Sequence, residues 1–590
     1  MIVPMKKITL LVAQQEVDEA LFKLRKLGVV HIEHLNEPKG KEINVLKKEL
    51  QNATLAFEAL HRGATSLRKE ETPDVKALIV KTVDLLQEKE QLLLKRDSLR
   101  AKISWFNEWG KISLASLQEL TRYGLFIKLY IIERKHLKRL PNDKYIFVVK
   151  KEKSRAYIVF ITFDNKESLG FDEVKFPQED PLLVEEEFSN IEKRLKEIEE
   201  RLNVLSRYRD VLKKYIFSLS KQLEFYTVRL SMAKEEGFWY LKGFIPEEEA
   251  HSLKQLAKKE GWAMLEEDPD NPEEVPTLIR NPRWVRIIEP VFKLMGTLPG
   301  YNEYDISIWF LLFLTVFFAI LIGDAGYGML FLMITFFLKR KLKNAPSEVF
   351  HLMYVFSIAT IIWGVCSGTY FGAAQFARLP FLKTLIIERI NSFVDANQQF
   401  MMYLCFLIGA IHLTVAHVIR AFRFHKSLIA LSQLGWIAII WGLFFVAGTL
   451  VVGRPFSNLG GYLLVTGVVF ALAFSYPNKN VFKALGNALM EVPLKIVSSF
   501  GDVVSYLRLF AVGYATVVVA GSFNDIAASL GFGDVIKSFG SALILFFGHA
   551  LNIALGFMAI VVHGVRLNML EFSGHLGMEW SGKPYMPFKE

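Results

Sequence analysis

Cysteine and the short signature motifs of enzymes are what this sequence has least of. The only two cysteines, Cys366 and Cys405, lie within apolar runs, so no disulfide framework or cysteine metal site is expected. No GxxxxGK(S/T) segment occurs, which predicts that the chain does not bind and hydrolyse ATP by itself. Its histidines form no HExxH or similar ligand spacing. We therefore predict no metal, no cofactor and no catalytic activity of its own.

The chain has little of the charge pattern that binds nucleic acid. The 71 basic residues are interleaved with 61 acidic ones, and no basic cluster carries interleaved aromatics, so nucleic acid is not expected as a partner. The excess of +10 is better explained by membrane topology. The start of the chain, MIVPMKKITLLVAQQEVDE, turns polar too soon for a cleavable signal peptide. The N-terminal half is accordingly expected to stay in the cytoplasm.

The apolar residues are distributed unevenly. Up to about residue 300 the chain is rich in Lys, Glu and Arg, and beyond it come long runs of Phe, Leu, Ile, Val and Gly. This contrast predicts an α+β cytoplasmic domain over residues 1–300 and a polytopic α-helical membrane domain over 301–590.

The soluble half contains two strand–helix–strand patterns about 230 residues apart. The first pattern has a helix that Gly28 is placed to stop, and the helix of the second is placed to end at Gly261. We expect the two to pair into one small α/β lobe formed by residues 1–40 and 236–275. Three further apolar runs, YGLFIKLYII, KYIFVVK and AYIVFIT, predict the strands of a second lobe over 106–180.

Long amphipathic helices are expected to join the two lobes. Leu85, Leu92 and Leu99 recur every seven residues, and Leu195 and Leu202 belong to a returning series of the same kind. Charged residues lie between them, as in an exposed coiled coil. We predict an antiparallel coiled-coil rod over residues 42–105 and 182–235. An ordinary amphipathic bundle is the alternative.

Seven apolar blocks follow in the second half. They lie near residues 307–338, 349–374, 400–421, 428–451, 460–475, 495–524 and 540–573. The first is too long for one straight helix across a core of about 30 Å.

The first block is interrupted by the sequence GDAGYG, which predicts a bend formed by Gly323, Asp324, Gly326 and Gly328. If the block is a bent hairpin, the basic segments KRKLK, RAFRFHK and NKNVFK all face the cytoplasm. The positive-inside rule thus favours eight transmembrane segments with both termini cytoplasmic.

An arginine lies inside one of these blocks, in GDVVSYLRLFAVGYATVVVAG. A guanidinium at the bilayer centre costs about 2.5–3.5 kcal/mol on insertion scales, so Arg508 is expected to have a purpose. Stepping by three and four from it gives a face of small residues, namely Gly501, Ser505, Ala511 and Ala515. We therefore expect Arg508 to face protein or a water-filled cavity.

The last block carries a second group of polar residues, in VVHGVRLNMLEF. His563 and Arg566 are about one turn apart, and Glu571 follows. Intramembrane ionisable groups usually mark ion or substrate paths. The alternative is that these side chains snorkel or form structural ion pairs, which is a particular possibility for Glu571 near the edge of the block.

Taken in this order, the motifs resemble a known family. The matching pieces are EPVFKLMGTLPGYNEYD, GDAGYG, SYLRLFA, HGVRLNMLE and GKPYMPF. In this order they are similar to subunit I, also called subunit a, of the V/A-type rotary ATPases. The lobes-on-a-rod pattern agrees, so the resemblance covers essentially the whole chain.

The resemblance implies a membrane stator subunit. Its expected partners are a rotating proteolipid c/K ring, peripheral stalk E and G subunits, central stalk and socket subunits, and the lipid bilayer. Arg508 matches the arginine that the family places at the ring interface, Arg566 the second arginine, Glu571 the acidic residue after it, and His563 a histidine of eukaryotic relatives. The expected location is a prokaryotic plasma membrane.

The sequence also departs from the eukaryotic relatives. A glutamate and a histidine of theirs are replaced by Gly556 and Thr516, and another acidic position falls at Leu494. Asp502, Glu491 and Ser505 are the residues we expect to line the half-channels instead. These differences leave H+ and Na+ both open, and the direction of ATP synthesis or hydrolysis also stays open.

Two other functions are compatible with parts of the sequence. A secondary ion transporter with a cytoplasmic regulatory domain should often carry an internal repeat with interrupted helices in both halves, whereas only one interruption is evident here. A purely structural membrane tether would leave Arg508 and Arg566 without a purpose. The sequence therefore favours an ion-translocating stator.

Overall fold

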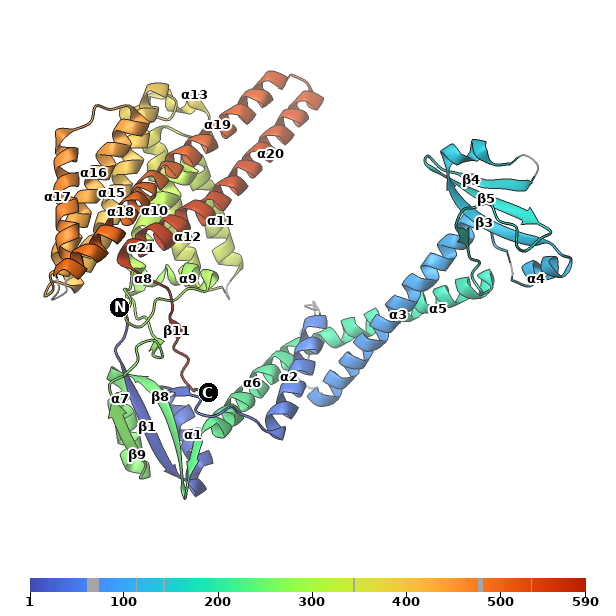
Figure 1. Ribbon diagram of the computed structural model, residues 1–590, viewed down its shortest axis with the longest axis horizontal. Coiled ribbons are helices and arrows are strands. Elements are labelled where there is room, and N and C mark those ends of the chain that lie inside the picture. The colour runs from blue at the N-terminus through green and yellow to red at the C-terminus, as the bar shows by residue number, and fades with distance from the viewer. Residues whose placement is uncertain (61–73, 113, 142–143, 343–344, 476–480, 532) are drawn as a thin grey trace. The chain divides into compact units, whose positions relative to one another are not determined.

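Figure 1 shows the protein as a computed structural model, which describes residues 1–590 except 61–73, 113, 142–143, 343–344, 476–480 and 532. The chain divides into two compact units. The first comprises Met1–Leu10, Leu27–Glu33 and Lys242–Lys589, and the second comprises Leu11–Lys26, His34–Leu241 and Glu590.

The first sheet joins strands from both ends of the predicted soluble half. Its order is β2-β8-β1-β9, and β7 also pairs with β8. The strands are β1 (Met5–Ala13), β2 (His31–Glu33), β7 (Ala233–Glu235), β8 (Phe238–Pro246) and β9 (Ala263–Glu267). Helix α7 (Glu247–Glu260) begins with three glutamates at the positive end of its dipole and ends at Gly261, whose φ is +75°. The two strand–helix–strand patterns therefore meet in one sheet.

The C-terminal motif GKPYMPF lies against the same lobe. Strand β11 (Lys583–Pro584) pairs in parallel with β10 (Pro276–Thr277). The Met586 amide donates to His31 Nδ1 at 3.0 Å, and the Phe588 amide donates to the Val30 carbonyl at 2.8 Å. The C-terminal tail thus connects the end of the helical part to the backbone of the first sheet within the first unit.

The helical part of the first unit begins with two short helices and continues with long apolar ones. They are α8 (Arg283–Arg286), α9 (Glu289–Met295), α10 (Ser307–Ile322), α11 (Ala325–Lys341), α12 (Ser347–Ser367), α13 (Ala374–Ala377), α14 (Pro380–Lys383), α15 (Gln398–Arg423), α16 (Ile429–Val452), α17 (Asn458–Phe474), α18 (Val481–Ser505), α19 (Leu507–Leu530), α20 (Val535–Ala559) and α21 (Ser573–Leu576). Phenylalanines from several of them, including Phe310, Phe406 and Phe444, are buried in one core.

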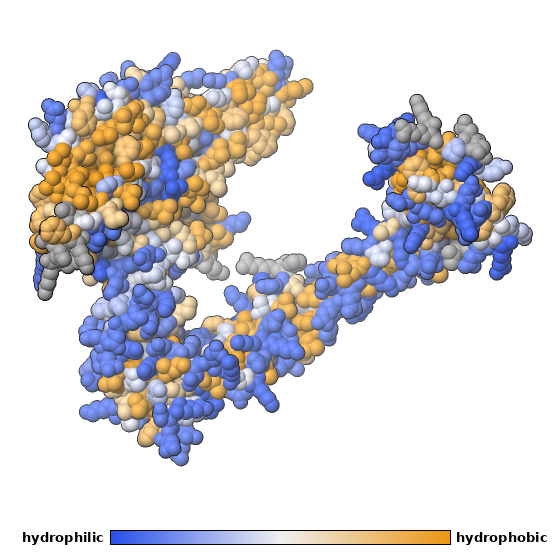
Figure 2. Space-filling view, in the orientation of Figure 1, coloured by the Kyte–Doolittle hydropathy of each residue, from blue (hydrophilic) through white to orange (hydrophobic). Residues whose placement is uncertain are grey.

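Among the described residues, five helical segments are long and apolar enough to cross a membrane, or six if a bent pair counts as one span. Helix α17 is apolar but has only 17 residues. The eight segments expected from the sequence are thus not established by helix length alone. The face of this part seen in Figure 2 is largely hydrophobic, as a lipid-facing surface should be.

The bent pair is α10 and α11, and the chain bends by 119° between them, at Gly323 and Asp324. Gly323 ends α10 at a φ of +64°. The buried Asp324 carboxylate caps α11 by accepting the Gly326 and Tyr327 amides, and it also accepts two amides of the segment after α12. Gly326 and Gly328 leave no room for a Cβ, because Phe371 and Ile361 pack directly against them.

The bend lets α12 begin near the point where α10 begins. Arg286, ahead of α10, pairs with Glu348 at the start of α12 at 3.1 Å. At the end of α15, the Arg423 guanidinium donates to the Asn302 carbonyl at 2.6 Å. The start of α10, the start of α12 and the end of α15 therefore lie on one side of the helical part, as a returning hairpin requires.

The second unit contains a four-stranded sheet and several long helices. Its sheet has the order β4-β5-β3-β6. The elements are α1 (Val17–Leu27), α2 (Lys41–Ala59), α3 (Val75–Trp109), α4 (Leu114–Arg122), β3 (Phe126–Glu133), β4 (Tyr145–Lys151), β5 (Arg155–Thr162), β6 (Glu173–Val174), α5 (Pro181–Leu205) and α6 (Arg209–Ser231). The three apolar runs predicted as strands correspond to β3, β4 and β5.

The long helices of this unit pack in pairs, α3 with α5 and α2 with α6. Leu195, Ile198 and Leu202 of α5 are buried in these contacts. The Tyr215 hydroxyl donates to Glu49 Oε1 at 2.6 Å, and this bond lowers the pKa of Glu49 below its ordinary value. The helices thus pack through apolar side chains, with a side-chain hydrogen bond at the edge of the contact.

Candidate functional site

Two long helical segments position the sequence-predicted site. One runs over Gly486–Leu530 and the other over Val535–Leu576, with 45 and 42 residues. Straight helices of those lengths would be about 65 Å long, roughly twice a bilayer core, so both must tilt strongly or extend beyond it. The first breaks at Tyr506, between α18 and α19. The second changes from α-helix to π-helix over Ile560–Gly564 and Leu567–Phe572.

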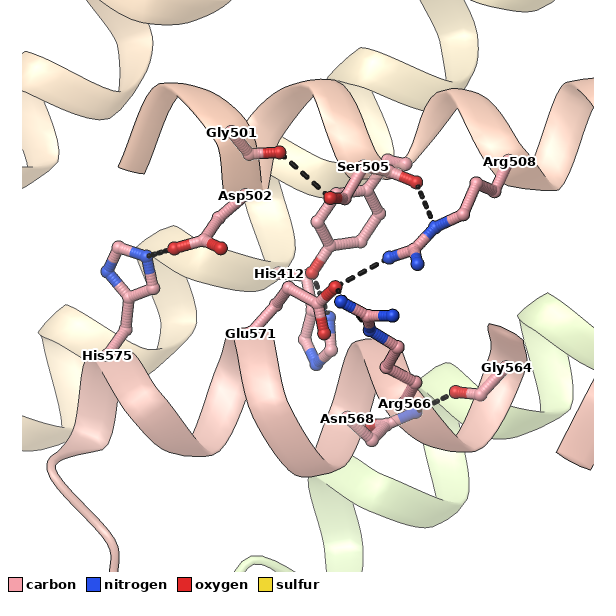
Figure 3. A network of polar contacts seen from close by, with 11 residues as sticks. His412, Gly501, Asp502, Ser505, Arg508, Gly564, Arg566, Asn568, Glu571 and His575 are labelled. Atoms are coloured by element: carbon pink, nitrogen blue, oxygen red, sulfur yellow. Dashed lines mark hydrogen bonds and ion pairs between the residues drawn. The ribbon is translucent and has the colours of Figure 1, made fainter. Parts of the chain in front are cut away.

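Arg508 points from α19 toward the second segment, as Figure 3 shows. Its Nε donates to the Ser505 carbonyl at 3.0 Å, and its Nη2 donates to Glu571 Oε1 at 2.5 Å. These bonds engage two of the five N–H groups of a guanidinium. The side chain is 24% exposed, which leaves it half-buried beside an almost fully buried carboxylate.

Glu571 lies between the two arginines. The Nε of Arg566 lies 3.7 Å from the same Oε1 that accepts from Arg508. Glu571 is 4% exposed, so these cationic partners stabilise a charge that is largely removed from solvent. Two positive charges and one negative charge give this arginine cluster, formed by Arg508, Arg566 and Glu571, a surplus of one positive charge.

The π-helical segments next to the cluster contain buried polar atoms that no described residue satisfies. They are His563 Nδ1, Asn568 Oδ1 and Glu571 Oε2. Buried polar groups in native proteins are nearly always hydrogen-bonded, and unpaired ones mark places where water or an ion belongs. Single π turns also concentrate at functional sites. The segment around Arg566 is thus suited to hold water.

A hydrogen-bonded chain extends away from the cluster on the other side of Glu571. His575 Nε2 donates to Asp502 Oδ2 at 3.1 Å, and His575 Nδ1 lies 2.9 Å from His417 Nε2. His417 Nδ1 in turn lies 2.7 Å from Gln433 Oε1. Asp502, His575, His417 and Gln433 therefore form one continuous polar chain across four helices.

The proton count of this chain depends on one amide. With the Gln433 oxygen facing His417, three protons are needed on the two imidazoles, so one of them is cationic. With the Gln433 NH2 facing His417, two protons suffice and both rings are neutral. Both orientations of the Gln433 amide therefore keep the chain continuous from Asp502 to Gln433.

A cavity of about 500 Å³ runs along this polar chain. Its lining includes the chain itself, several serines, and Arg566 and Glu571 at one end. The residues that line it are His417, Arg420, Phe424, Ile429, Ser432, Gln433, Trp436, Ser475, Lys495, Ser498, Ser499, Asp502, Ser505, Arg566, Leu570, Glu571, Gly574 and His575. The cavity is roomy and polar enough for many water molecules, which would carry an aqueous path as far as the arginine cluster.

The structure does not bring every sequence-predicted residue to this place. Ser505 lines the cavity, and its hydroxyl donates to the Gly501 carbonyl at 2.8 Å. Glu491 pairs with Lys495 at 2.9 Å on an exposed part of α18, and Lys495 rather than Glu491 reaches the cavity. Among the described residues, no group of three or more His, Cys, Asp or Glu side chains is arranged to hold a metal ion.

Sequence reasoning missed His417, Gln433 and His575. His575 could have been found, because it follows Glu571 by four residues on the same segment. His417 and Gln433 lie in apolar runs whose periodicity does not distinguish a buried polar path from ordinary packing. The place of His417 and Gln433 in the polar chain is evident only from the packing of the helices against one another.

Comparisons with known proteins give matches along the whole chain. It is 32% identical to V-type ATP synthase subunit I of Borreliella burgdorferi over 620 aligned residues, covering 100% of both chains. It is 29% identical to V-type ATP synthase subunit I 1 of Treponema pallidum, again over 100% of both. A-type ATP synthase subunit I of Methanocaldococcus jannaschii is 26% identical, covering 60% of this chain and 56% of that one.

The other two comparisons add little. A solved structure described as the cytoplasmic N-terminal domain of subunit I, homolog of subunit a, of V-ATPase has 15% identity and a TM-score of 0.23, covering 44% of this chain and 99% of that chain. No family model matches the chain.

Proposed function

This chain belongs to the family of V-type ATP synthase subunit I, and from this premise we propose that its helical part provides the ion path against a rotating proteolipid ring. The observation that carries the proposal is the arginine cluster at the end of the polar cavity. The ion is H+ or Na+, and this chain contributes no nucleotide chemistry.

The charge of the cluster fits a ring carboxylate as its fourth member. The surplus positive charge of Arg508, Arg566 and Glu571 would be balanced when one ring carboxylate arrives without its ion. Two unit charges 4 Å apart interact by about 4 kcal/mol at an effective dielectric constant of 20. That interaction corresponds to a fall of about three units in the pKa of the arriving carboxylate, enough to release its ion.

The same charges oppose a leak. A free cation that entered the cavity and approached Arg566 or Arg508 would meet repulsion of the same order, about 4 kcal/mol. A cation bound to a ring carboxylate avoids the obstacle, because it can travel around with the ring. Ions would therefore cross only when the ring turns.

Glu571 would act as the partner of Arg508 while no ring carboxylate is near. Its Oε1 already lies within 3.7 Å of Arg566 Nε, so it keeps a cation when Arg508 turns to the ring. This exchange avoids leaving either an arginine or the buried carboxylate unpaired.

The cavity along Asp502 and His575 supplies the first half-channel in this proposal. It is polar, Arg566 and Glu571 of the cluster line it, and the hydrogen bond between His575 and Asp502 lies along its wall. The basic ends of α11 and α15 support an orientation with the termini in the cytoplasm of a prokaryotic cell. The bend between α10 and α11 supports eight segments, with α17 as a short one.

The N-terminal half is proposed to be a mechanical stator element. The paired helices α3 with α5 and α2 with α6 would form the coiled-coil rod between two lobes, over residues 42–105 and 182–235. The exposed charged faces of these helices would bind the peripheral stalk E and G subunits. A lobe at one end of the rod would lie near the central stalk and socket subunits. A secondary transporter receives no support from the comparisons, and a passive tether leaves the arginine cluster unexplained.

ATP-driven ion uptake by proteoliposomes of the whole complex tests the proposal. Arg508→Ala should abolish uptake while assembled complex is still recovered. Arg508→Lys should lose most of the uptake, because a lysine lacks the planar, bidentate and always charged guanidinium. Arg454→Ala is the matched control, since Arg454 stacks on the Tyr403 ring away from the cluster. Normal uptake by assembled Arg508→Ala contradicts the proposal. Repeating the assay with Na+ and with a protonophore identifies the ion.

A further inference from the structure

Glu303, a half-buried residue just ahead of α10, joins two segments that are far apart in the sequence. Its Oε2 accepts the Gly300 amide of its own loop at 2.7 Å. Its Oε1 accepts the Glu579 amide at 2.6 Å and the Trp580 amide at 3.1 Å, 276 and 277 residues further along the chain. Hydrogen bonds from amides to a carboxylate are charge-assisted and stronger than bonds between neutral groups. Glu303 thus fixes the backbone that follows α21 to the entry of α10.

The backbone of Trp580 is held in an unfavourable conformation at this junction. Its φ is +57°, in the left-handed region that a bulky side chain rarely occupies. Such a conformation persists only where surrounding contacts over-determine it, and it is concentrated at functional sites. Two contacts do so here, because Glu303 accepts the Trp580 amide and the Phe292 ring centroid lies 5.9 Å from the Trp580 ring centroid.

The next residues of the C-terminal tail complete the junction. The Gly582 amide donates to the Leu298 carbonyl at 3.1 Å. A Cβ on Gly582 would overlap the Pro299 carbonyl, so the tail lies directly against the backbone ahead of α10. Beyond Gly582, strand β11 of the tail pairs with β10. The chain that follows α21 is therefore held at several successive places and cannot slide along its own direction.

This fixed tail continues directly from the π-helical segment Leu567–Phe572, through α21. The Trp580 side chain also returns to that segment's end, because its Nε1 donates to Ser573 Oγ at 3.3 Å. A π turn is equivalent to one extra residue in an α-helix. It reverts to an α-helix if the chain beyond it moves by one residue, about 1.5 Å along the axis and about 100° around it. A tail fixed at Trp580 and Gly582 opposes that movement.

We propose that Glu303 is a positioning residue for ion translocation. By holding the Trp580 backbone it keeps Leu567–Phe572 in the π-helical form, in which Arg566 Nε lies 3.7 Å from Glu571 Oε1. Reversion to an α-helix would turn these two side chains to different faces and separate them. The inference rests on the proposed function. It gives a role in that function to two motifs outside the arginine cluster, LPGYNEYD and GKPYMPF.

A double-variant cycle in the whole complex tests whether Glu303 acts through Arg566. Glu303→Ala and Arg566→Ala are each expected to lower ATP-driven uptake per assembled complex about fivefold, and independent losses would multiply to about twenty-five-fold in the double variant. If Glu303 acts through Arg566, the double variant should lose no more than the larger single loss. A merely structural contribution of Glu303 would not depend on Arg566. Multiplied losses, or parental uptake by Glu303→Ala, overturn the inference.

The tail offers a matched control. Glu579→Ala removes an exposed carboxylate but keeps the amide that Glu303 accepts, so it should transport like the parent. Where Glu303→Ala does not assemble, Glu303→Gln keeps one acceptor oxygen and enters the same cycle, with a smaller single loss expected. Arg508→Ala in the same preparation separates the two proposals. If it is inactive while the losses multiply, this inference alone fails, and if it transports normally, the proposed function fails.

A disulfide across the same junction gives a second readout. A Cβ on Gly300 would lie 3.0 Å from Ser581 Oγ, so Gly300→Cys/Ser581→Cys is placed to form a bridge. In the Glu303→Ala chain with Cys366 and Cys405 replaced by alanine, oxidation should restore most of the ATP-driven uptake, and reduction should remove it again. A bridge that forms without recovery of uptake overturns the inference.

Discussion

The ion pair between Arg508 and Glu571 allows the structural and the transport roles of the arginine to be separated. Arg508→Ala leaves Glu571, which is 4% exposed, with only Arg566 Nε at 3.7 Å as a cation. Removing one partner of a buried pair typically costs about 3–5 kcal/mol. The 24% exposure of Arg508 and the remaining Arg566 reduce the expected loss to about 2 kcal/mol, a factor of about thirty in the ratio of folded to unfolded protein.

The double variant Arg508→Ala/Glu571→Gln should recover most of that loss, because no uncompensated carboxylate is then buried. Its transport should stay absent, because no cation remains at position 508 to discharge the ring carboxylate. The assay compares the thermal midpoint of the purified complex with ATP-driven uptake, normalised to assembled complex. Recovery of uptake together with stability in the double variant would show that Arg508 serves only to neutralise Glu571, and the proposed mechanism would then be wrong.

Three further predictions concern the rest of the chain. Leu195→Asp/Leu202→Asp places charges in the buried contact of α5. The double variant should reduce the stalk subunits recovered in pull-downs, while the membrane part still assembles. Normal stalk content and normal transport would contradict the proposed coiled-coil rod. Because the pKa of Glu49 is lowered in the folded state, its carboxylate contributes stability above the ordinary carboxyl pKa, and this stability is lost as the pH falls through the folded pKa. Glu49→Gln should therefore make the thermal unfolding midpoint depend less on pH below about pH 4.5. An unchanged pH dependence argues against the Tyr215 bond. Gly513→Val should prevent α19 from approaching α10, since even a Cβ there would lie 2.4 Å from a carbonyl oxygen of α10, and assembly at parental yield contradicts that packing.

Many elements of the fold were predictable because the local sequence pattern favours the same structure that the tertiary packing requires. Gly28 and Gly261 end helices at positive φ, as their positions after apolar periodic segments indicated. The bend at Gly323 and Asp324 was predictable because a helix pair of that length cannot lie straight in a bilayer. The position of Arg508 followed from the cost of burying a charge.

The polar partners of the arginine were predictable only in part. Glu571 was found because it is charged, but Glu491 was chosen by the same argument and lies on an exposed face with Lys495. Charge in an apolar run indicates that a residue has a role, and only the packing of helices decides which role. Neutral polar residues such as Gln433 carry no such signal, since single amides are also tolerated in helix packing.

The π-helix explains why the pairing of Arg566 with Glu571 could not be derived from helical stepping. Residues five apart on an α-helix lie about 140° apart around its axis, so the two side chains would point to different faces. A π turn closes its hydrogen bond between residues i and i+5, which brings positions five apart close to one face. Leu567–Phe572 adopts this form, and Arg566 Nε then lies 3.7 Å from Glu571 Oε1. In the proposed mechanism, this local widening would provide the second cation that Glu571 needs when Arg508 turns to the ring, and without it the exchange of partners would leave a buried carboxylate unpaired.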